Sequence, residues 1–168
     1  MTAQTASAAA AQIHQLKFAR FCTKKIVEGI PADKMCTIPP GCAKHALWVI
    51  GHLACTDDYF LMEFGGRKSA VPEAWQKIFG MNSTASADTK IYPPVDQVLK
   101  TLDAGHAAVI KWLETLTPEQ LEKAMPDGWQ AYAPTLGDVP GFGAWHEGYH
   151  AGQLSAVRKG LGLPAAFG

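Results

Sequence analysis

Apolar residues recur at intervals of three and four between residues 95 and 116. The stripe comprises Val95, Val98, Leu99, Leu102, Val109, Ile110, Leu113 and Leu116. This spacing is the period of an α-helix, and it gathers the apolar side chains on one face. A helix with such a face needs other elements to cover it, so the segment predicts a domain of packed helices.

Two further helices are predicted before this segment. The first covers residues 7 to about 30 and stops at Pro31, because proline cannot continue a helix. Its apolar residues are Ile13, Phe18, Phe21, Cys22 and Ile26. The second follows the Pro-Pro-Gly break at residues 39–41 and runs to the glycine pair at residues 65–66.

The fourth predicted helix ends at Gly160. Thr135 is a candidate N-cap, since Asp138 follows it at the capping-box spacing. Pro140 and the glycines up to Gly143 weaken the first turns, so we expect the regular helix to begin near Gly143.

Four long amphipathic helices predict an all-α fold, a four-helix bundle in one domain spanning residues 1–168. No alternating apolar and polar run of strand length competes with them. The connection at residues 65–94 contains a short helical segment, PEAWQKIF, and is long enough to cross the bundle, so the helices it joins can run parallel. A second short helix, TPEQLEKA, has Thr117 as its cap and Gln120 completing a capping box.

Charge and cysteine content exclude several classes of protein. Fifteen basic residues balance fifteen acidic ones without a basic run, so we expect neither a nucleic acid nor a membrane as partner. The four cysteines form no C-x-x-C pair, which favours free thiols in a reducing compartment. The start of the chain lacks the features of a secretion signal, so a cytoplasmic location is expected.

His146, Glu147 and His150 form an H-E-x-x-H motif in the fourth helix. Residues four apart share one helix face, and their rings stand roughly 6 Å apart along the axis, so both can bind one metal ion. A zinc protease takes a third ligand from downstream of this motif. The chain after His150 contains no His, Asp, Glu or Cys, which excludes the protease interpretation.

A third ligand must therefore come from another helix. His52 is the best placed, because Val49, Thr56 and Phe60 lie on the same helix face and direct its ring inward. His45 lies about 10 Å further along this helix, too far to reach the same ion.

His106 interrupts the apolar stripe of the third helix and is the reserve ligand, although a hydrogen-bonded core position is the more common role for such a residue. His14, among polar neighbours, is expected in solvent.

Other residues around the motif have several interpretations. Glu147 is a weak candidate for a catalytic base, and a structural hydrogen bond to a neighbouring helix or to the glycine-rich start of its own helix is the preferred interpretation. Gln153 is a candidate either to contact another helix or to orient a histidine ligand. Gly152 is expected to allow close helix approach. The candidate pocket residues are Tyr149, Trp129 and Tyr132, with an ordinary core position as the alternative.

The chain resembles the DinB-like superfamily of metal-binding four-helix bundles. The resemblance rests on HEGYHAGQ in the fourth helix and on His52-Leu53-Ala54 in the second. It implies that His52, His146 and His150 bind one divalent metal ion in a bundle with a left-handed twist and an up-down-down-up arrangement, frequently as a homodimer. Some members of the superfamily transfer or use low-molecular-weight thiols, and others have no known reaction.

Two functions of different kinds follow. The leading hypothesis is a metal-dependent thiol or group transferase acting on a small-molecule substrate, with zinc or nickel activating a thiol or water. The alternative is a non-catalytic metal-binding or stress-response protein. A fourth protein ligand, such as His106 or a cysteine, would favour a closed structural site, whereas an open coordination position would favour the enzyme.

Overall fold

The computed structural model describes residues 3–167 of the chain. Its long helices are α1 (Ala3–Val27), α2 (Ala46–Glu63), α4 (Val95–Glu114) and α6 (Val139–Gly160), and its short ones are α3 (Glu73–Phe79) and α5 (Pro118–Leu121). Short 3-10 turns occupy Ala32–Lys34, Thr89–Ile91 and Leu136–Asp138. Within this range no strand is present, only an isolated bridge between Ala124 and Thr135. The prediction of an all-α fold is confirmed.

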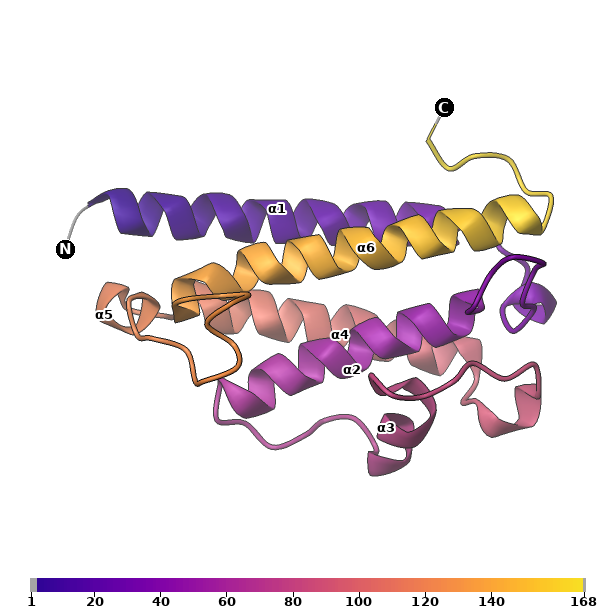
Figure 1. Ribbon diagram of the computed structural model, residues 1–168, viewed down its shortest axis with the longest axis horizontal. Coiled ribbons are helices and arrows are strands. Elements are labelled where there is room, and N and C mark those ends of the chain that lie inside the picture. Colours follow the sequence, from indigo (N-terminus) through magenta and orange to yellow (C-terminus); the bar gives the residue numbers. More distant parts are fainter. Residues whose placement is uncertain (1–2, 168) are drawn as a thin grey trace.

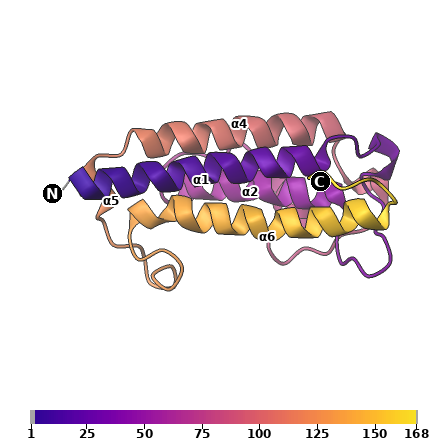
Figure 2. The same ribbon diagram turned by 90° about the horizontal axis from the view of Figure 1, so that it is seen from above.

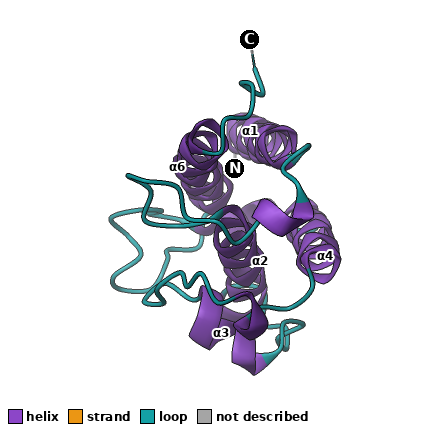
Figure 3. Cartoon of the chain, turned by 90° about the vertical axis from the view of Figure 1, so that its right-hand side faces the viewer, coloured by secondary structure: helices purple, strands orange, loops and turns teal. Residues whose placement is uncertain are grey.

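The four long helices lie side by side in two pairs. Figure 1 shows α1 and α6 running in one direction along the molecule, while α2 and α4 run in the opposite direction. The closest pairings are α1 with α6 and α2 with α4. Figure 2 shows the same helices from above, and Figure 3 shows α3 on the outer side of α2. The long connection between α2 and α4 makes their parallel course possible.

Helix α1 buries a different face from the one that its aromatic residues indicated. Phe18 and Phe21 are 61% and 52% exposed and stack on each other at the surface. The buried stripe instead follows Ile13 and Leu16 at helical spacing to Arg20 and then Thr23 and Val27. A charged side chain thus enters the interior of the molecule.

Helix α6 begins at Val139, about one turn earlier than expected. The capping box of Thr135 and Asp138 closes the preceding 3-10 turn, which leads directly into the helix. Pro140 lies in the first turn, where a backbone amide needs no helical acceptor and proline is tolerated. The predicted box of Thr117 and Gln120 on α5 is confirmed.

The interior contains two apolar clusters at opposite ends of the long helices. One joins the start of α2 to α3 and the ends of α1 and α6, and its most buried members include Leu47, Ile50, Phe79, Leu102 and Leu154. The other joins the opposite helix ends and includes Leu16, Phe60, Val109, Leu113 and Val139. The polar residues Arg20, Asp57 and Glu147 are buried between these two clusters along the helices.

The cysteines are free thiols, as the sequence predicted. All four cysteines are unpaired, and burial raises the pKa of the Cys55 thiol to about 12. Across the described residues, no helix has the length and apolar character needed to span a lipid bilayer.

Candidate metal centre

Three histidines from two helices lie close together. His52 comes from α2, and His146 and His150 come from α6. One ring nitrogen of each lies within 4.8 Å of the corresponding nitrogens of the other two. The structure therefore brings together the three residues that the sequence selected.

A backbone carbonyl fixes the ring of His52. Its Nδ1 lies 2.8 Å from the carbonyl oxygen of Phe79, at the end of α3. A carbonyl oxygen can only accept, so Nδ1 is the protonated nitrogen and donates the hydrogen bond. Nε2 then carries the free lone pair, which is the form a metal-binding imidazole requires.

A glutamine fixes the ring of His150 in the same way. Its Nδ1 donates to Oε1 of Gln153, 3.0 Å away and one turn later on α6. This contact again leaves the lone pair on Nε2, so Gln153 has the orienting position expected for it. Because both residues belong to one helix, the contact needs no other element to form.

The spacing of the ring nitrogens fits a shared ion. Nε2 of His146 lies 3.2 Å from Nε2 of His150. Two imidazole nitrogens bound to one zinc ion at about 2.0–2.1 Å in tetrahedral geometry are separated by roughly 3.3 Å. The α6 pair therefore already has the separation of two ligands of one metal ion.

The three rings are held in the neutral form that metal binding requires. Burial, together with the neighbouring rings of His150 and His52, lowers the pKa of His146 to about 3. Burial and the ring of His52 lower the pKa of His150 to about 4. Burial also lowers the pKa of His52. Protons therefore compete weakly with a metal ion at neutral pH.

Glu147 is not part of this cluster. It belongs with Arg20 and Asp57 to a group of buried polar residues that we call the polar layer. Its two carboxylate oxygens accept hydrogen bonds from Nε and an Nη of Arg20, at 2.7 and 2.9 Å. The same guanidinium donates to Asp57 at 3.0 Å and to the carbonyl of Leu102 at 2.9 Å. The interhelical hydrogen bond preferred for Glu147 is thus present, and it joins α1 to α6.

The polar layer carries one more acidic than basic group. Burial raises the pKa of Asp57 to about 6, although Arg20 opposes this shift. Burial alone would lower the pKa of Arg20, but the carboxylates of Asp57 and Glu147 hold it above its ordinary value. Gly105 of α4 allows this layer to close, because a Cβ there would stand 3.2 Å from the Cβ of Asp57.

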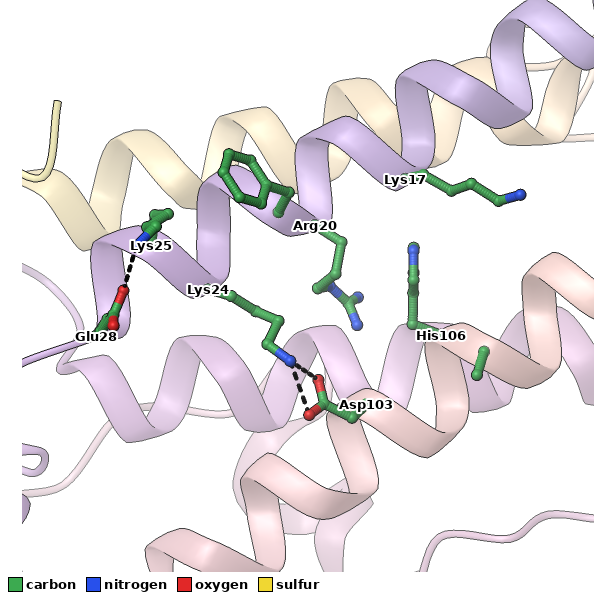
Figure 4. Close-up of a pocket in the computed structure, with 9 residues that line it drawn as sticks. Lys17, Arg20, Lys24, Lys25, Glu28, Asp103 and His106 are labelled. Carbon is green, nitrogen blue, oxygen red and sulfur yellow. Dashed lines mark hydrogen bonds and ion pairs between the residues drawn. The ribbon is translucent and has the colours of Figure 1, made fainter.

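The reserve ligand His106 lies elsewhere. Its ring lines a hollow of about 580 Å³ between α1 and α4, together with Arg20, Lys17 and Lys24 (Figure 4). Neither ring nitrogen has a hydrogen-bond partner among the described residues, and burial lowers the pKa of His106 to about 4. It is not part of the histidine cluster.

The remaining histidines have separate positions. His45 is fully buried as the N-cap of α2, where Nδ1 accepts from the amide of Trp48 and Nε2 contacts the carbonyl of Ser86. His14 is exposed, as expected. The expectation for Gly152 is wrong, because a Cβ there would meet no atom within 4 Å.

Two parts of the site were missed by sequence reasoning. The burial of Arg20 could have been predicted, since Arg20 lies at helical spacing from Ile13 and Leu16. Phe18 and Phe21 instead indicated a different buried face. The role of the Phe79 carbonyl could not have been predicted, because a backbone oxygen at the end of a short helix has no residue-specific sequence pattern.

The candidate pocket residues Tyr149 and Tyr132 are exposed, and Trp129 is half-buried.

A known protein family matches most of the chain. The family model of the DinB superfamily matches residues 15–154, which include all three histidines. The chain therefore belongs to the DinB superfamily. No curated protein matches the chain.

Proposed function

We propose that the chain binds one divalent metal ion through Nε2 of His52, His146 and His150. The observation that carries this proposal is the convergence of these nitrogens, with Nδ1 of His52 and of His150 each engaged by an acceptor. Ring nitrogens that converge on one point in a largely buried site are costly unless an ion or a proton lies between their lone pairs. Zinc and nickel are the proposed metals, since both accept imidazole ligands.

We propose further that this centre serves a thiol or group transfer reaction on a small-molecule substrate. Among the described residues the cluster contains three donors and no fourth His, Cys, Asp or Glu. Three protein ligands leave coordination positions for a water or a substrate group, as in catalytic rather than structural zinc sites. When bound, the metal would lower the pKa of a thiol or water at such a position and so supply a nucleophile near neutral pH.

The residues of the chain prepare the site for that role. Phe79 and Gln153 hold two rings in the ligand tautomer. Trp48 stacks on the ring of His52, with centroids 4.9 Å apart and planes 9° apart, and covers the cluster on that side. Together these contacts keep the ligands fixed and partly shielded from water, which strengthens the electrostatic effect of a bound cation.

The arrangement of the chain supports the wider family proposal. The parallel pairs α1 with α6 and α2 with α4 are consistent with an up-down-down-up four-helix bundle. A left-handed twist, a homodimer, a low-molecular-weight thiol cofactor and a cytoplasmic location belong to the same proposal.

Elemental analysis tests the metal site. We expect about one zinc or nickel ion per chain in the purified protein and a large loss of metal in His52→Ala. His14→Ala is the matched control, because this histidine is exposed and should leave the metal content unchanged. Equal metal content in the parent and His52→Ala proteins would refute the three-histidine site.

An assay of thiol consumption with small electrophiles tests the reaction. We expect turnover by the metal-loaded protein and its loss on treatment with a chelator. Turnover that resists the chelator would refute metal activation of the thiol. Full metal loading with no turnover on any thiol would support the non-catalytic alternative.

A further inference from the structure

An exposed aromatic surface borders the histidine cluster. We call it the aromatic face and define it as Trp145 and Tyr149 of α6 with Tyr132 of the preceding connection, all exposed, together with the half-buried Phe142 and Trp129. Trp145 is 60% exposed, Tyr149 57% and Tyr132 64%. Large aromatic side chains gathered at a surface mark binding sites in soluble proteins more often than isolated ones do.

Helical spacing places this face beside the ligands. Phe142 lies four residues before His146 and Tyr149 three residues after it, so both share its side of α6, and Trp145 lies four residues before Tyr149. Gly148 directly precedes Tyr149 in the sequence, and a Cβ at Gly148 would meet no atom within 4 Å. The surface of α6 beside Tyr149 is therefore open at Gly148.

The aromatic face is continuous with the metal ligands. The ring of Phe142 stacks on that of His146, with centroids 6.0 Å apart and planes 21° apart. The ring of Tyr149 meets that of His150 edge-on at 5.2 Å. A group held by either aromatic ring would therefore lie within a few ångströms of the ligand rings.

The rings of the face also support one another. Trp145 and Tyr149 stack with centroids 6.0 Å apart and planes 25° apart. Phe142 contacts Trp129 edge-on at 5.2 Å and Tyr132 at 5.8 Å. Mutual ring contacts restrict the rotamers of these side chains before binding, so the side chains would lose less conformational entropy when a ligand binds.

We propose that the aromatic face is a subsite for an aromatic group on the substrate of the metal centre. The proposal rests on the proposed metal site. The exposed rings of Trp145 and Tyr149 would stack with a planar apolar group, while a metal-binding head on the same molecule would reach the histidine cluster. This assigns specificity for aromatic thiols or aromatic electrophiles over small aliphatic ones.

The test uses cobalt-loaded protein and two thiols with the same head group. Titration with 2-phenylethanethiol and with ethanethiol, followed by the thiolate-to-cobalt absorption band, gives both dissociation constants. We expect the aromatic thiol to bind about tenfold more tightly. Trp145→Ala and Tyr149→Ala should each reduce this preference several-fold. Phe18→Ala is the matched control, because Phe18 is equally exposed but contacts Phe21 on α1.

A parallel measurement separates this inference from the metal proposal. Saturation-transfer NMR with 2-phenylethanol on metal-free protein reports aromatic binding without any ion, and the signal should be weaker in Trp145→Ala. If no metal binds but this difference persists, the aromatic subsite stands alone. If metal binds and the preference is equal in parent and Trp145→Ala proteins, the aromatic subsite is refuted. Dissociation of a dimer by Trp145→Ala, with the preference unchanged, would also refute it and assign the face to a second copy.

Discussion

The guanidinium of Arg20 on α1 binds the carboxylate of Glu147 on α6 through two hydrogen bonds, 2.7 and 2.9 Å long. Glu147 stands between the two α6 ligands in the sequence, so this buried pair fixes the helix that carries His146 and His150. The same arginine reaches Asp57 on α2, the helix that carries His52. One side chain therefore ties together both helices of the metal centre.

Arg20→Met should strongly destabilise the fold. It leaves the carboxylates of Asp57 and Glu147 buried without a partner, and removal of one member of a buried ion pair costs about 3–5 kcal/mol. Urea denaturation measures the loss in the free energy of unfolding. Lys17→Met is the control, because its bond to Glu114 is exposed and worth less than about 1 kcal/mol. Similar losses in both variants would contradict the structural role of Arg20.

Glu147→Gln should keep its metal. The carboxylate is occupied by Arg20, and the ligand nitrogens belong to the histidines. We expect a metal content like that of the parent protein and a lower free energy of unfolding, whereas His150→Ala should lose the ion. Elemental analysis of the two folded variants gives the comparison, and equal metal loss in both would show that Glu147 acts at the metal.

Gln153→Ala should weaken metal binding by about 10- to 100-fold without unfolding the protein. The substitution removes the acceptor that keeps the proton of His150 on Nδ1. Gln153→Glu retains an acceptor oxygen and should restore most of the affinity. Competition with a chromophoric chelator measures both constants. Parent-like affinity in the alanine variant would mean that the ring of His150 is oriented by other contacts.

Gly51→Ala should disturb both the core and the site. A Cβ at Gly51 would stand 2.5 Å from the ring of Phe79, whose carbonyl orients His52. Overpacking of this kind costs about 1–3 kcal/mol, and we expect weaker metal binding as well. Gly148→Ala is the matched control on α6, where the added methyl meets open space and should raise helix stability by about 0.5–1 kcal/mol. Thermal denaturation with and without zinc distinguishes the two.

His106 should make the stability of the protein depend on pH. Burial, with the nearby charge of Arg20, lowers its pKa from 6.5 to about 4. As the pH falls between these values, the unfolded chain takes up a proton that the folded chain does not, so the free energy of unfolding decreases.

His106→Leu removes this contribution. Relative to the parent protein, the variant should gain roughly 1–2 kcal/mol of stability when the pH is lowered from about 7.5 to about 5. Metal-free protein must be used for both, so that the other histidines contribute equally. Parallel pH profiles for the two proteins would show that His106 is not held neutral.

Several helices of the fold could be predicted from local sequence patterns. The stripe from Val95 to Leu116 predicted α4, and the capping box of Thr117 and Gln120 predicted α5. These features depend on residues a few positions apart, whose geometry within a helix is nearly fixed. The start of α6 was placed too late because Pro140 is tolerated in a first turn, which a count of helix breakers does not consider.

The sequence by itself determined the α6 half of the metal site. A helix has 3.6 residues per turn, so His146 and His150 share one face wherever the helix packs. It also indicated His52, because the apolar neighbours of this residue on its own helix mark the buried side.

Apart from Gln153, which follows His150 by three residues on α6, only the tertiary structure decided what surrounds these ligands. The carbonyl of Phe79 accepts a hydrogen bond from His52, and Arg20 donates two to Glu147. Each of these contacts joins residues far apart in the chain, and their meeting depends on how the helices pack against one another. Helix periodicity gives the face on which a side chain stands, but side-chain packing between helices selects the atom it meets.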